Sequence, residues 1–496
     1  MQHQSLREVY DASRARSVFK IVDAEGDYDW SILHAAITRL ASQLHQAGLE
    51  PGQAVLYQGG QSADAFVLFW ATVLLGGVFA PVDASWPDYQ LQQAAGPLRA
   101  KVVAGDPEAV ERLHRVAPTA HALPLPLDIA ETDHPVEFLA SAPSAPAAYL
   151  FTSGSTGVPK AVVLSHGALA LGAALTWETF GWRPGDRLLN LPEPHTMSGL
   201  RNAFIAAPLG GLVWTPTEAG GSIFELVDII AEQRCTRLVC GPSLLRQFVL
   251  LGDRLPARAF ADLKAIYCTG ARLAPLDAAT VSQRLSVPVI NYYGLTETGG
   301  LCISQSIENW TPDDQSLGVA VGAEAAIVAD DGSRAQPGEP GELRIRSRQL
   351  MNGYFGDPAA TAARFAEDGW LRTGDVARQL PDGRIELVGR AAHFIKTAST
   401  DRVHPEEVEL VLEQHEAVAE AAVCGAVDDL GRERICALVV LRGAAADQAT
   451  APQRLASFVA QRLGPARSPR DIRFTDRLPR GGSGKLIRGD LPGYFK

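Results

Sequence analysis

The chain has 496 residues, of which 46% are hydrophobic and 20% charged, and its formal net charge is -11. Such a composition is typical of a globular protein of about two to four domains. The acidic balance argues against a non-specific nucleic-acid binder, whose surface would be basic. We therefore expect no nucleic-acid partner and favour small-molecule chemistry.

The spacing of the cysteines and the length of the apolar runs indicate where in the cell the protein is expected to be. The six cysteines show no C-x-x-C spacing and lie mostly in apolar runs, which predicts reduced, buried thiols. The residues after Met1 show no charged region followed by an apolar stretch, so we expect no secretory signal. The uncharged run 65–82 is long enough for a membrane span, but Gly76 and Gly77 divide it into a helix and a short strand. We expect a cytoplasmic protein with no membrane segment.

The first elements alternate between helix and strand. Apolar residues recur at helical spacing over 30–49 and end at Gly48, which predicts an amphipathic helix. Short apolar strands are predicted at 54–57 and 101–104, and a helix at 107–116. The proline-rich stretch 120–148 has no sustained period and is predicted to be a connecting loop. This alternation favours a layered α/β domain.

A polar loop between two predicted strands follows, within residues 149–166. Its hydroxyl and glycine residues are Thr152, Ser153, Gly154, Ser155, Thr156 and Gly157. Hydroxyls and free backbone N–H groups suit a loop that wraps phosphate oxygens, and Lys160 adds a cation. The spacing differs from that of a Walker loop, and a plain Ser- and Gly-rich turn is the alternative.

Alternation continues to about residue 292 and then gives way to strands. The predicted helices are 167–177, 224–232 and 243–251, the strands are 187–191, 237–240, 265–268 and 288–292, and 192–199 is a loop. A β-rich segment begins near Gly338, with a hairpin of strands 376–380 and 384–388. Beyond Arg390 we predict a compact α+β unit with helices 405–412 and 453–463 and strands 419–423, 435–441 and 472–474.

Six motifs, in order along the chain, carry a family resemblance. They are TSGSTGVPK (152–160), NYYGLTETG (291–299), GELRIRSRQLMNGYF (341–355), WLRTGD (370–375), ELVGR (386–390) and LPRGGSGKLIR (478–488). Together they resemble the adenylate-forming (ANL) superfamily of acyl- and aryl-CoA synthetases, peptide-synthetase adenylation domains and luciferases. The resemblance implies an α/β fold. A large N-terminal domain, residues 1–390, would combine layered αβ subdomains with a β-rich subdomain, and a small mobile α+β C-terminal domain would span 391–496.

The resemblance also implies a reaction and its catalytic groups. A carboxylate would attack the α-phosphorus of ATP to give an acyl-adenylate and pyrophosphate, a step dominated by positioning and charge neutralisation. The loop 152–160, with Lys160, would hold the β- and γ-phosphates, Thr296 the α-phosphate, and Glu297 a Mg²⁺ ion. Lys485 would be the catalytic lysine. Without the motifs, Glu297 would be a surface acid and Lys485 part of a flexible basic tail.

Nucleotide binding is assigned to a second group of residues. Tyr293 would stack on adenine, and the backbone of Gly270, Ala271 and Arg272 would line the same slot, although Arg272 departs from the small or acidic residue usual there. Asp375 and Arg390 would hold the ribose. A turn-capping role is the alternative for Asp375.

His195 stands where the family places an aromatic gate beside the acid, so we expect it to bind substrate; a structural histidine is the alternative. The expected walls of the acid pocket are Gly199, Cys240, Gly241, Gly294, Leu295 and Gly300. Amino-acid activators place an aspartate in this region, and 192–199 has none. We therefore expect an unaminated acid, with a small aromatic acid such as a hydroxybenzoate favoured.

The segment after Arg390 departs from the family pattern. Ala392 replaces an acidic hinge residue, Ser399 stands near an expected glycine, and one extra residue separates Lys396 from Arg402. This leaves the acyl acceptor open between coenzyme A, the phosphopantetheine arm of an acyl carrier protein, and an amine attacked directly. Thioester formation is favoured, direct amide synthesis is the alternative, and a nucleotide-binding regulator without turnover is a third possibility from another class.

Overall fold

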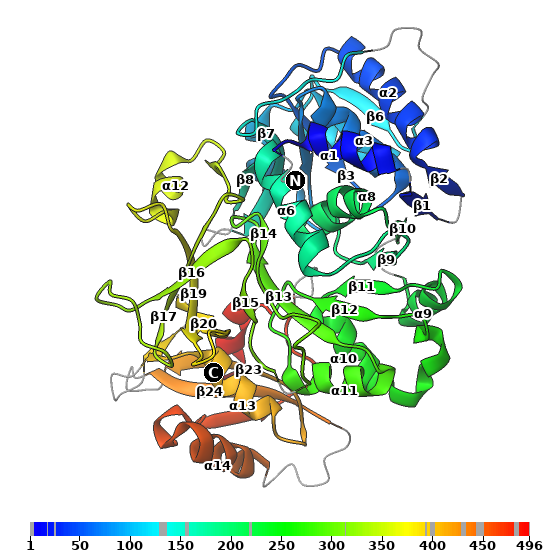
Figure 1. The fold of residues 1–496 in the computed structure, drawn as a ribbon. Helices are drawn as coiled ribbons and strands as arrows, with labels where there is room; N and C mark the ends of the chain where they lie inside the picture. Colours follow the sequence, from blue (N-terminus) through cyan, green and yellow to red (C-terminus); the bar gives the residue numbers. More distant parts are fainter. Residues whose placement is uncertain are drawn as a thin grey trace.

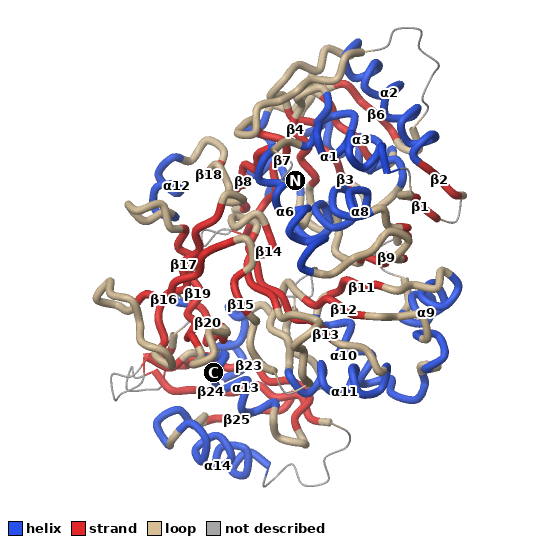
Figure 2. The backbone as a smooth tube through the Cα atoms, in the orientation of Figure 1, coloured by secondary structure: helices blue, strands red, loops and turns tan. Residues whose placement is uncertain are grey.

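The structure is a computed structural model (Figure 1). It describes residues 4–16, 18–23, 26–127, 136–153, 158–217, 221–312, 314–391, 394–396, 402–427, 433–442, 451–480 and 486–495. Within these residues the amino-terminal part holds a seven-stranded, a nine-stranded and a four-stranded sheet, and the carboxy-terminal part holds smaller ones (Figure 2).

The seven-stranded sheet, counted over the described residues, has the order β18-β8-β7-β4-β3-β5-β6. Its strands are β3 (Ala54–Gln58), β4 (Val78–Pro81), β5 (Val102–Gly105), β6 (His121–Pro124), β7 (Pro146–Ser153), β8 (Pro159–Ser165) and β18 (Gly353–Tyr354). Strands β3, β4 and β5 are parallel and almost wholly buried, as expected for continuous apolar runs covered on both faces. Strands β7 and β8 form an antiparallel hairpin at the other side of the sheet.

The nine-stranded sheet, again over the described residues, has the order β15-β14-β13-β12-β11-β9-β10-β1-β2. Its strands are β1 (Lys20–Val22), β2 (Asp27–Asp29), β9 (Arg187–Asn190), β10 (Val213–Thr215), β11 (Arg237–Cys240), β12 (Ala265–Cys268), β13 (Val289–Leu295), β14 (Gly300–Ser304) and β15 (Val319–Ala320). Strands β9 to β13 run parallel, and β14 turns back antiparallel on β13.

Helices cover these sheets. They are α1 (Leu6–Arg16), α2 (Trp30–Gln46), α3 (Ala63–Leu74), α4 (Asp88–Ala95), α5 (Pro107–Val116), α6 (His166–Thr179), α7 (Met197–Gly199), α8 (Ala207–Gly210), α9 (Ile223–Glu232), α10 (Pro242–Leu251), α11 (Pro275–Leu285) and α12 (Pro358–Arg364). Local signals set their starts: Asp29 caps α2 by accepting from two backbone N–H groups, and Ser62 caps α3 through one.

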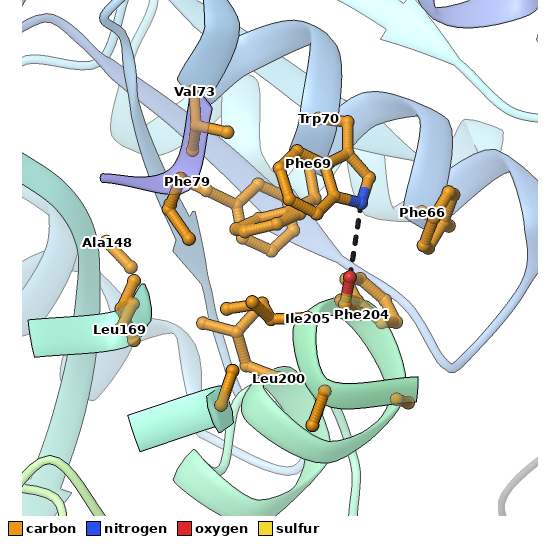
Figure 3. Close-up of a cluster of buried hydrophobic side chains, with 14 of the residues drawn as sticks. Phe66, Phe69, Trp70, Val73, Phe79, Ala148, Leu169, Leu200, Phe204 and Ile205 are labelled. Atoms are coloured by element: carbon orange, nitrogen blue, oxygen red, sulfur yellow. Dashed lines mark hydrogen bonds between the residues drawn. The ribbon is translucent and has the colours of Figure 1, made fainter. Parts of the chain in front are cut away.

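A large apolar cluster between the two sheets fixes a π-helical segment, η2 (Leu200–Ala206). Figure 3 shows Phe66, Phe69 and Trp70 of α3 facing Leu200, Phe204 and Ile205 of η2. The indole Nε1 of Trp70 donates a hydrogen bond to the carbonyl oxygen of Phe204, 3.1 Å away (Figure 3). Because π-helical turns are rare and occur often at functional sites, η2 marks a place to look for function.

The β-rich part is a four-stranded antiparallel sheet in the order β16-β17-β19-β20, counted over the described chain. Its strands are β16 (Ala323–Val328), β17 (Pro340–Ser347), β19 (Leu371–Gln379) and β20 (Ile385–Arg390). Leu343 and Ile345 are both buried, as their two-residue alternation predicts. The predicted hairpin around residues 381–383 is confirmed as β19 and β20.

The carboxy-terminal unit contains β21 (Ile395–Lys396), β22 (Arg402–Val403), α13 (Pro405–Glu413), β23 (Val418–Val427), β24 (Glu433–Leu441), α14 (Ala451–Leu463) and β25 (Asp471–Phe474). Strands β23, β24 and β25 form a sheet with their own apolar core. Figure 1 shows this unit, in orange to red, beside β20 and at the end of the molecule remote from α2. The α/β fold class with a smaller carboxy-terminal unit is therefore confirmed.

Four predicted boundaries are wrong. The loop predicted over 120–148 contains β6, which pairs in parallel with β5. The loop predicted over 192–199 becomes helical at Met197. Thr152 and Ser153 are the end of β7, and β13 extends to Leu295 instead of ending at residue 292. Backbone pairing decides three of these cases, β6 with β5, the end of β7 with Lys160 and Pro159, and Leu295 with Gly300, and local composition does not register it.

Two further predictions meet the structure directly. All six cysteines, which lie in described segments, are buried free thiols. Within the described part of the chain, no helix has both the length and the apolar character needed to cross a bilayer.

Candidate active site

A buried carboxylate lies at the junction of the nine-stranded and four-stranded sheets. Asp375 of β19 is opposite Arg390 of β20, and the Arg390 Nε lies 2.6 Å from the Asp375 Oδ1. From β13, the hydroxyl of Tyr293 donates a 2.6 Å hydrogen bond to the Asp375 Oδ2. The Asp375 residue is only 2% exposed. The structure thus brings together three residues predicted to bind the nucleoside.

Thr373 holds this carboxylate in place. Its hydroxyl donates to the carbonyl oxygen of Leu343 at 2.6 Å and accepts from the backbone N–H of Asp375 at 3.0 Å. Burial raises the pKa of Asp375, although Arg390 and the Tyr293 hydroxyl lower it. Each oxygen of a carboxylate has two acceptor sites, so both keep capacity for a ribose hydroxyl.

Glu297 follows β13 in the turn toward β14 and is 6% exposed. The hydroxyl of Tyr354 donates to the Glu297 Oε1 at 2.8 Å, and a guanidinium nitrogen of Arg364 lies 3.4 Å from the same oxygen. Arg364 also lowers the pKa of Asp375 electrostatically, so the two carboxylates share one neighbourhood. Thr296, the residue before Glu297, is partly exposed.

Lys160 lies on the other side of Tyr354. Its ammonium is 2.8 Å from the Asp357 Oδ2 and 5.4 Å from the centre of the Tyr354 ring. The hydrogen bond from Lys160 lowers the pKa of Asp357. Thr152, at the start of the predicted polar loop, is paired with Lys160 across β7 and β8.

The predicted adenine slot follows β12. Gly270 has a φ of +91°, which a residue with a side chain rarely adopts, and Gly270 and Ala271 are exposed. Arg272 pairs with Glu413 at the end of α13. The unusual residue of the slot therefore connects it to the carboxy-terminal unit.

The predicted acid side centres on the loop after β9. The His195 Nε2 lies 3.7 Å from the Asp83 Oδ2. Burial and the nearby Asp83 raise the pKa of Glu193 from 4.5 to about 7. A Cβ added at Gly199 would overlap the carbonyl oxygen of Glu193, so glycine permits the close approach of these backbones.

The remaining pocket walls lie around β11, β13 and β14. Cys240 ends β11 and is buried, and Gly241 begins α10 as its N-cap. Gly294 faces the carbonyl oxygen of Gly300 so closely that a Cβ would overlap it. Leu295 ends β13 next to Thr296, so one hairpin carries pocket walls and phosphate-side residues together.

Several predicted residues lie outside the described part of the chain. They are Gly154, Ser155, Thr156, Gly157, Ala392, Ser399 and Lys485. Their assigned roles stay predictions.

Sequence reasoning missed Tyr354, Asp357, Arg364 and Arg201. Tyr354 lies inside the motif 341–355, but the motif alone did not indicate a function for this residue. Asp357 and Arg364 follow it in α12 and its N-cap, and no motif pointed to them. Arg201 is fully buried in η2, inside an apolar run that gave no sign of a functional cation.

Comparisons with known proteins agree with this arrangement. The profile of the family described as AMP-binding enzyme matches residues 10–355, and that of the AMP-binding enzyme C-terminal domain matches residues 407–485. The chain belongs to the AMP-binding enzyme family and, with it, to the adenylate-forming superfamily that its motifs resemble. The predicted enzyme class, an acid-activating ligase, is confirmed at this level.

Individual relatives span nearly the whole chain. The fatty acid–[acyl-carrier-protein] ligase ScoC of Streptomyces coeruleorubidus is 30% identical, over 93% of this chain and 91% of that protein. The sulfoacetate–CoA ligase of Cupriavidus necator is 31% identical, over 89% of this chain and 87% of that protein. The crystal structure of a benzoate CoA ligase from Burkholderia xenovorans matches the fold with a TM-score of 0.88 at 24% identity, over 98% of this chain and 99% of that one.

Proposed function

We propose that this protein activates a carboxylic acid with ATP and then passes the acyl group to a pantetheine thiol. The observation that supports this most directly is the convergence of Asp375, Arg390 and Tyr293 with Glu297 and Lys160. Oxygen acceptors for a ribose, a hard carboxylate and an ammonium group are the groups that a nucleoside triphosphate needs.

In the first step a carboxylate oxygen of the acid bonds to the α-phosphorus, and the bond from that phosphorus to pyrophosphate breaks. Lys160 and the loop 152–157 would hold the departing phosphates, and Lys485 would stabilise charge on the α-phosphate oxygens. The donor set fits Mg²⁺, because Glu297 presents a carboxylate oriented by Tyr354. A bound Mg²⁺ would neutralise phosphate charge, with Glu297 and Thr296 beside it.

In the second step a thiol sulfur attacks the acyl carbon and AMP leaves. The named relatives use either a carrier protein or coenzyme A as acceptor. We therefore propose one of these pantetheine thiols, with direct transfer to an amine as the alternative that the changed residues Ala392 and Ser399 leave open. We also propose that residues 1–390 and 391–496 are the two domains.

The acid is proposed to be small and unaminated. A loop 192–199 without aspartate offers no partner for an α-amine, and a Cβ added at Gly241 would meet no atom closer than 3.8 Å, which leaves room for a ring on that side. A small aromatic acid is the expectation from the sequence, and His195, part-buried beside Asp83, lies at this loop.

Pyrophosphate release tests the first step. Release that depends on both ATP and an acid from a panel of benzoates and short-chain acids is the expected result. The Lys485→Ala variant should lose at least about 10³-fold in this rate, whereas Lys20→Ala, at an exposed position in β1, should retain it. Silence with every acid would overturn the proposal.

The acceptor test uses the acid that is active. Coenzyme A, a holo carrier protein and a panel of amines are added in turn, and the acyl product is identified by mass. Thioester formation supports the proposed second step, and amide formation without thioester supports the alternative. Nucleotide binding without release of pyrophosphate would favour the regulator.

A further inference from the structure

One buried cation belongs to none of the contacts described above. The side chain of Arg201, in η2, is fully buried. Its Nε and one terminal nitrogen bond the Asn202 Oδ1 at 3.2 and 3.0 Å. Over the described residues, its second terminal nitrogen, NH1, has no hydrogen-bond partner, and Arg201 forms no ion pair. Burial lowers the pKa of this guanidinium.

Other buried arginines of this chain are neutralised. Arg237 pairs with Asp186 at 3.0 Å, and Arg246 pairs with Asp277 at 2.9 Å. A buried charge without a countercharge is costly, which is why buried charges in proteins are normally paired. Arg201 differs from these two buried arginines because no described carboxylate pairs with it.

The neighbours of Arg201 are polar but neutral. Asn202 donates from Nδ2 toward the Asn190 Oδ1 at 3.3 Å, and the Tyr292 hydroxyl donates to the Ser198 Oγ at 3.1 Å. Tyr292 acts against the effect of burial and raises the pKa of the Arg201 guanidinium, so its hydroxyl is close to that group. These groups orient the guanidinium, yet none of them carries the negative charge that it lacks.

The NH1 nitrogen lies beside Gly300, a residue that is expected to line the acid pocket. A Cβ added at Gly300 would overlap NH1 and also meet the Met197 side chain, so the absence of a side chain at Gly300 makes room for the cation. Gly300 is a predicted pocket wall, and Met197 lies in α7, just after the loop of His195. Methionine is unbranched and flexible, so the Met197 side chain can move away from NH1 when a ligand binds.

We propose that Arg201 selects acids that carry a second anionic group, a carboxylate or sulfonate, in addition to the carboxylate that is adenylated. This inference rests on the proposed function, because it assigns the substrate class of the same site. The second group would accept hydrogen bonds from NH1 and supply the missing countercharge. The expected aromatic acid is then better matched by a benzene dicarboxylate than by a hydroxybenzoate, whose hydroxyl carries no charge at neutral pH.

Matched pairs of acids test the selection in the wild-type protein. Succinate is compared with butyrate, sulfoacetate with propionate, and terephthalate with 4-methylbenzoate, each by ATP-dependent pyrophosphate release. We expect the anionic member to lead by at least about 100-fold in kcat/KM in one pair or more. A preference for the neutral member in every active pair would overturn the inference while leaving acid activation itself intact.

Variants then assign the preference to one side chain. Arg201→Met should lower kcat/KM for the anionic acid at least about 30-fold and leave the neutral acid within about threefold, or improve it. Arg246→Met is the matched control, since it removes a buried arginine that has a carboxylate partner, and it should leave the ratio between the two acids unchanged. Equal losses for both acids in Arg201→Met would overturn the assignment.

Thermal unfolding gives a readout that needs no turnover. Without ligand, Arg201→Met should unfold at the same temperature as wild type or higher, because it removes an uncompensated charge. Arg246→Met should unfold at a lower temperature, because Asp277 is left unpaired. A dicarboxylate should raise the wild-type midpoint and leave that of Arg201→Met unchanged. If the unfolding midpoint of Arg201→Met instead falls as far as that of Arg246→Met, the role of Arg201 is structural. The inference then fails, even where pyrophosphate release supports the proposed function.

Discussion

The nucleotide side and the acid side of the candidate site balance their charges differently. On the nucleotide side, Asp375 lies between Arg390 and Tyr293, and Glu297 lies within reach of Tyr354 and Arg364. On the acid side, Arg201 is buried among neutral groups over the part of the chain that the structure describes.

This difference separates positioning from selection. A paired carboxylate is held rigid before ligand arrives, and removing its partner leaves a costly unpaired charge. An unpaired cation gains its partner only when a ligand with the right charge binds. On the proposed function, the nucleotide side is preorganised and the acid side would be completed by its substrate.

The largest effect should come from breaking the paired side at Asp375. Asp375→Asn removes the charge that neutralises Arg390 and weakens the acceptors proposed for the ribose. We expect kcat/KM for ATP in pyrophosphate release to fall about 10- to 100-fold, in line with the roughly 1.5–3 kcal/mol that a hydrogen bond to a charged group contributes.

Asp382→Asn is the control for that variant. Asp382 lies in the turn of the same hairpin and pairs with Arg384 at 2.7 Å, but its side chain is 52% exposed. It should stay within twofold of wild type, because exposed pairs contribute little. A similar loss in both variants would mean that the hairpin as a whole, and not Asp375, was affected.

A second prediction concerns the acid side at Glu193. Its pKa of about 7 in the folded protein, against 4.5 ordinarily, means that the folded state favours the protonated carboxyl. That preference stabilises the fold fully below pH 4.5, and the stabilisation is lost as pH rises through 7. Glu193→Gln should therefore raise the stability by about 1–2 kcal/mol at pH 8, where the wild-type carboxyl is ionised.

Thermal unfolding at pH 5 and pH 8 measures this effect. The gain in Glu193→Gln should be present at pH 8 and nearly absent at pH 5. Glu178→Gln, at an exposed position in α6, should show no such dependence on pH. A gain of equal size at both pH values would show that ionisation of Glu193 is not its cause.

A smaller effect is expected at Tyr354. Tyr354→Phe keeps the ring near Lys160 and removes the hydroxyl that donates to Glu297. Loss of a hydrogen bond to a charged group predicts about a fivefold to tenfold rise in the Mg²⁺ concentration needed for half-maximal pyrophosphate release. Tyr89→Phe, at an exposed residue, is the control. An unchanged requirement for Mg²⁺ would separate Tyr354 from the orientation of Glu297.

Local signals made much of the fold predictable. The helix Pro107–Val116 and the strand Arg237–Cys240 were predicted to the residue. In the structure Asp106 caps the helix, Pro107 starts it, and the strand is a short, bounded apolar run. The π-helical segment Leu200–Ala206 was not predicted, since its spacing departs from the 3.6-residue period. Packing against α3 decides it, and that contact spans more than a hundred residues.

The candidate site divides in the same way. Asp375, Arg390 and Glu297 lie within motifs, so their neighbourhood was expected. The partners that hold them were harder to see, because Tyr354 and Arg364 reach Glu297 from 57 and 67 residues further along the chain. Arg201 could not be assigned a role from sequence, because its significance lies in the absence of a countercharge among its described neighbours.

The smallest effect is expected where the nucleotide side meets the carboxy-terminal unit, at Arg272 and Glu413. If this pair holds the two parts together, Arg272→Gln, Glu413→Gln and the double variant should each change the ratio of adenylation to thioester formation by about twofold to threefold, with no further change in the double variant. The coupling should weaken with added salt.

The pair Arg234–Asp262, exposed and within the amino-terminal part, is the matched control and should show no effect on the ratio. Additive changes in the double variant would mean that Arg272 acts on the adenine slot alone, and the preorganisation of the nucleotide side would then owe nothing to the carboxy-terminal unit.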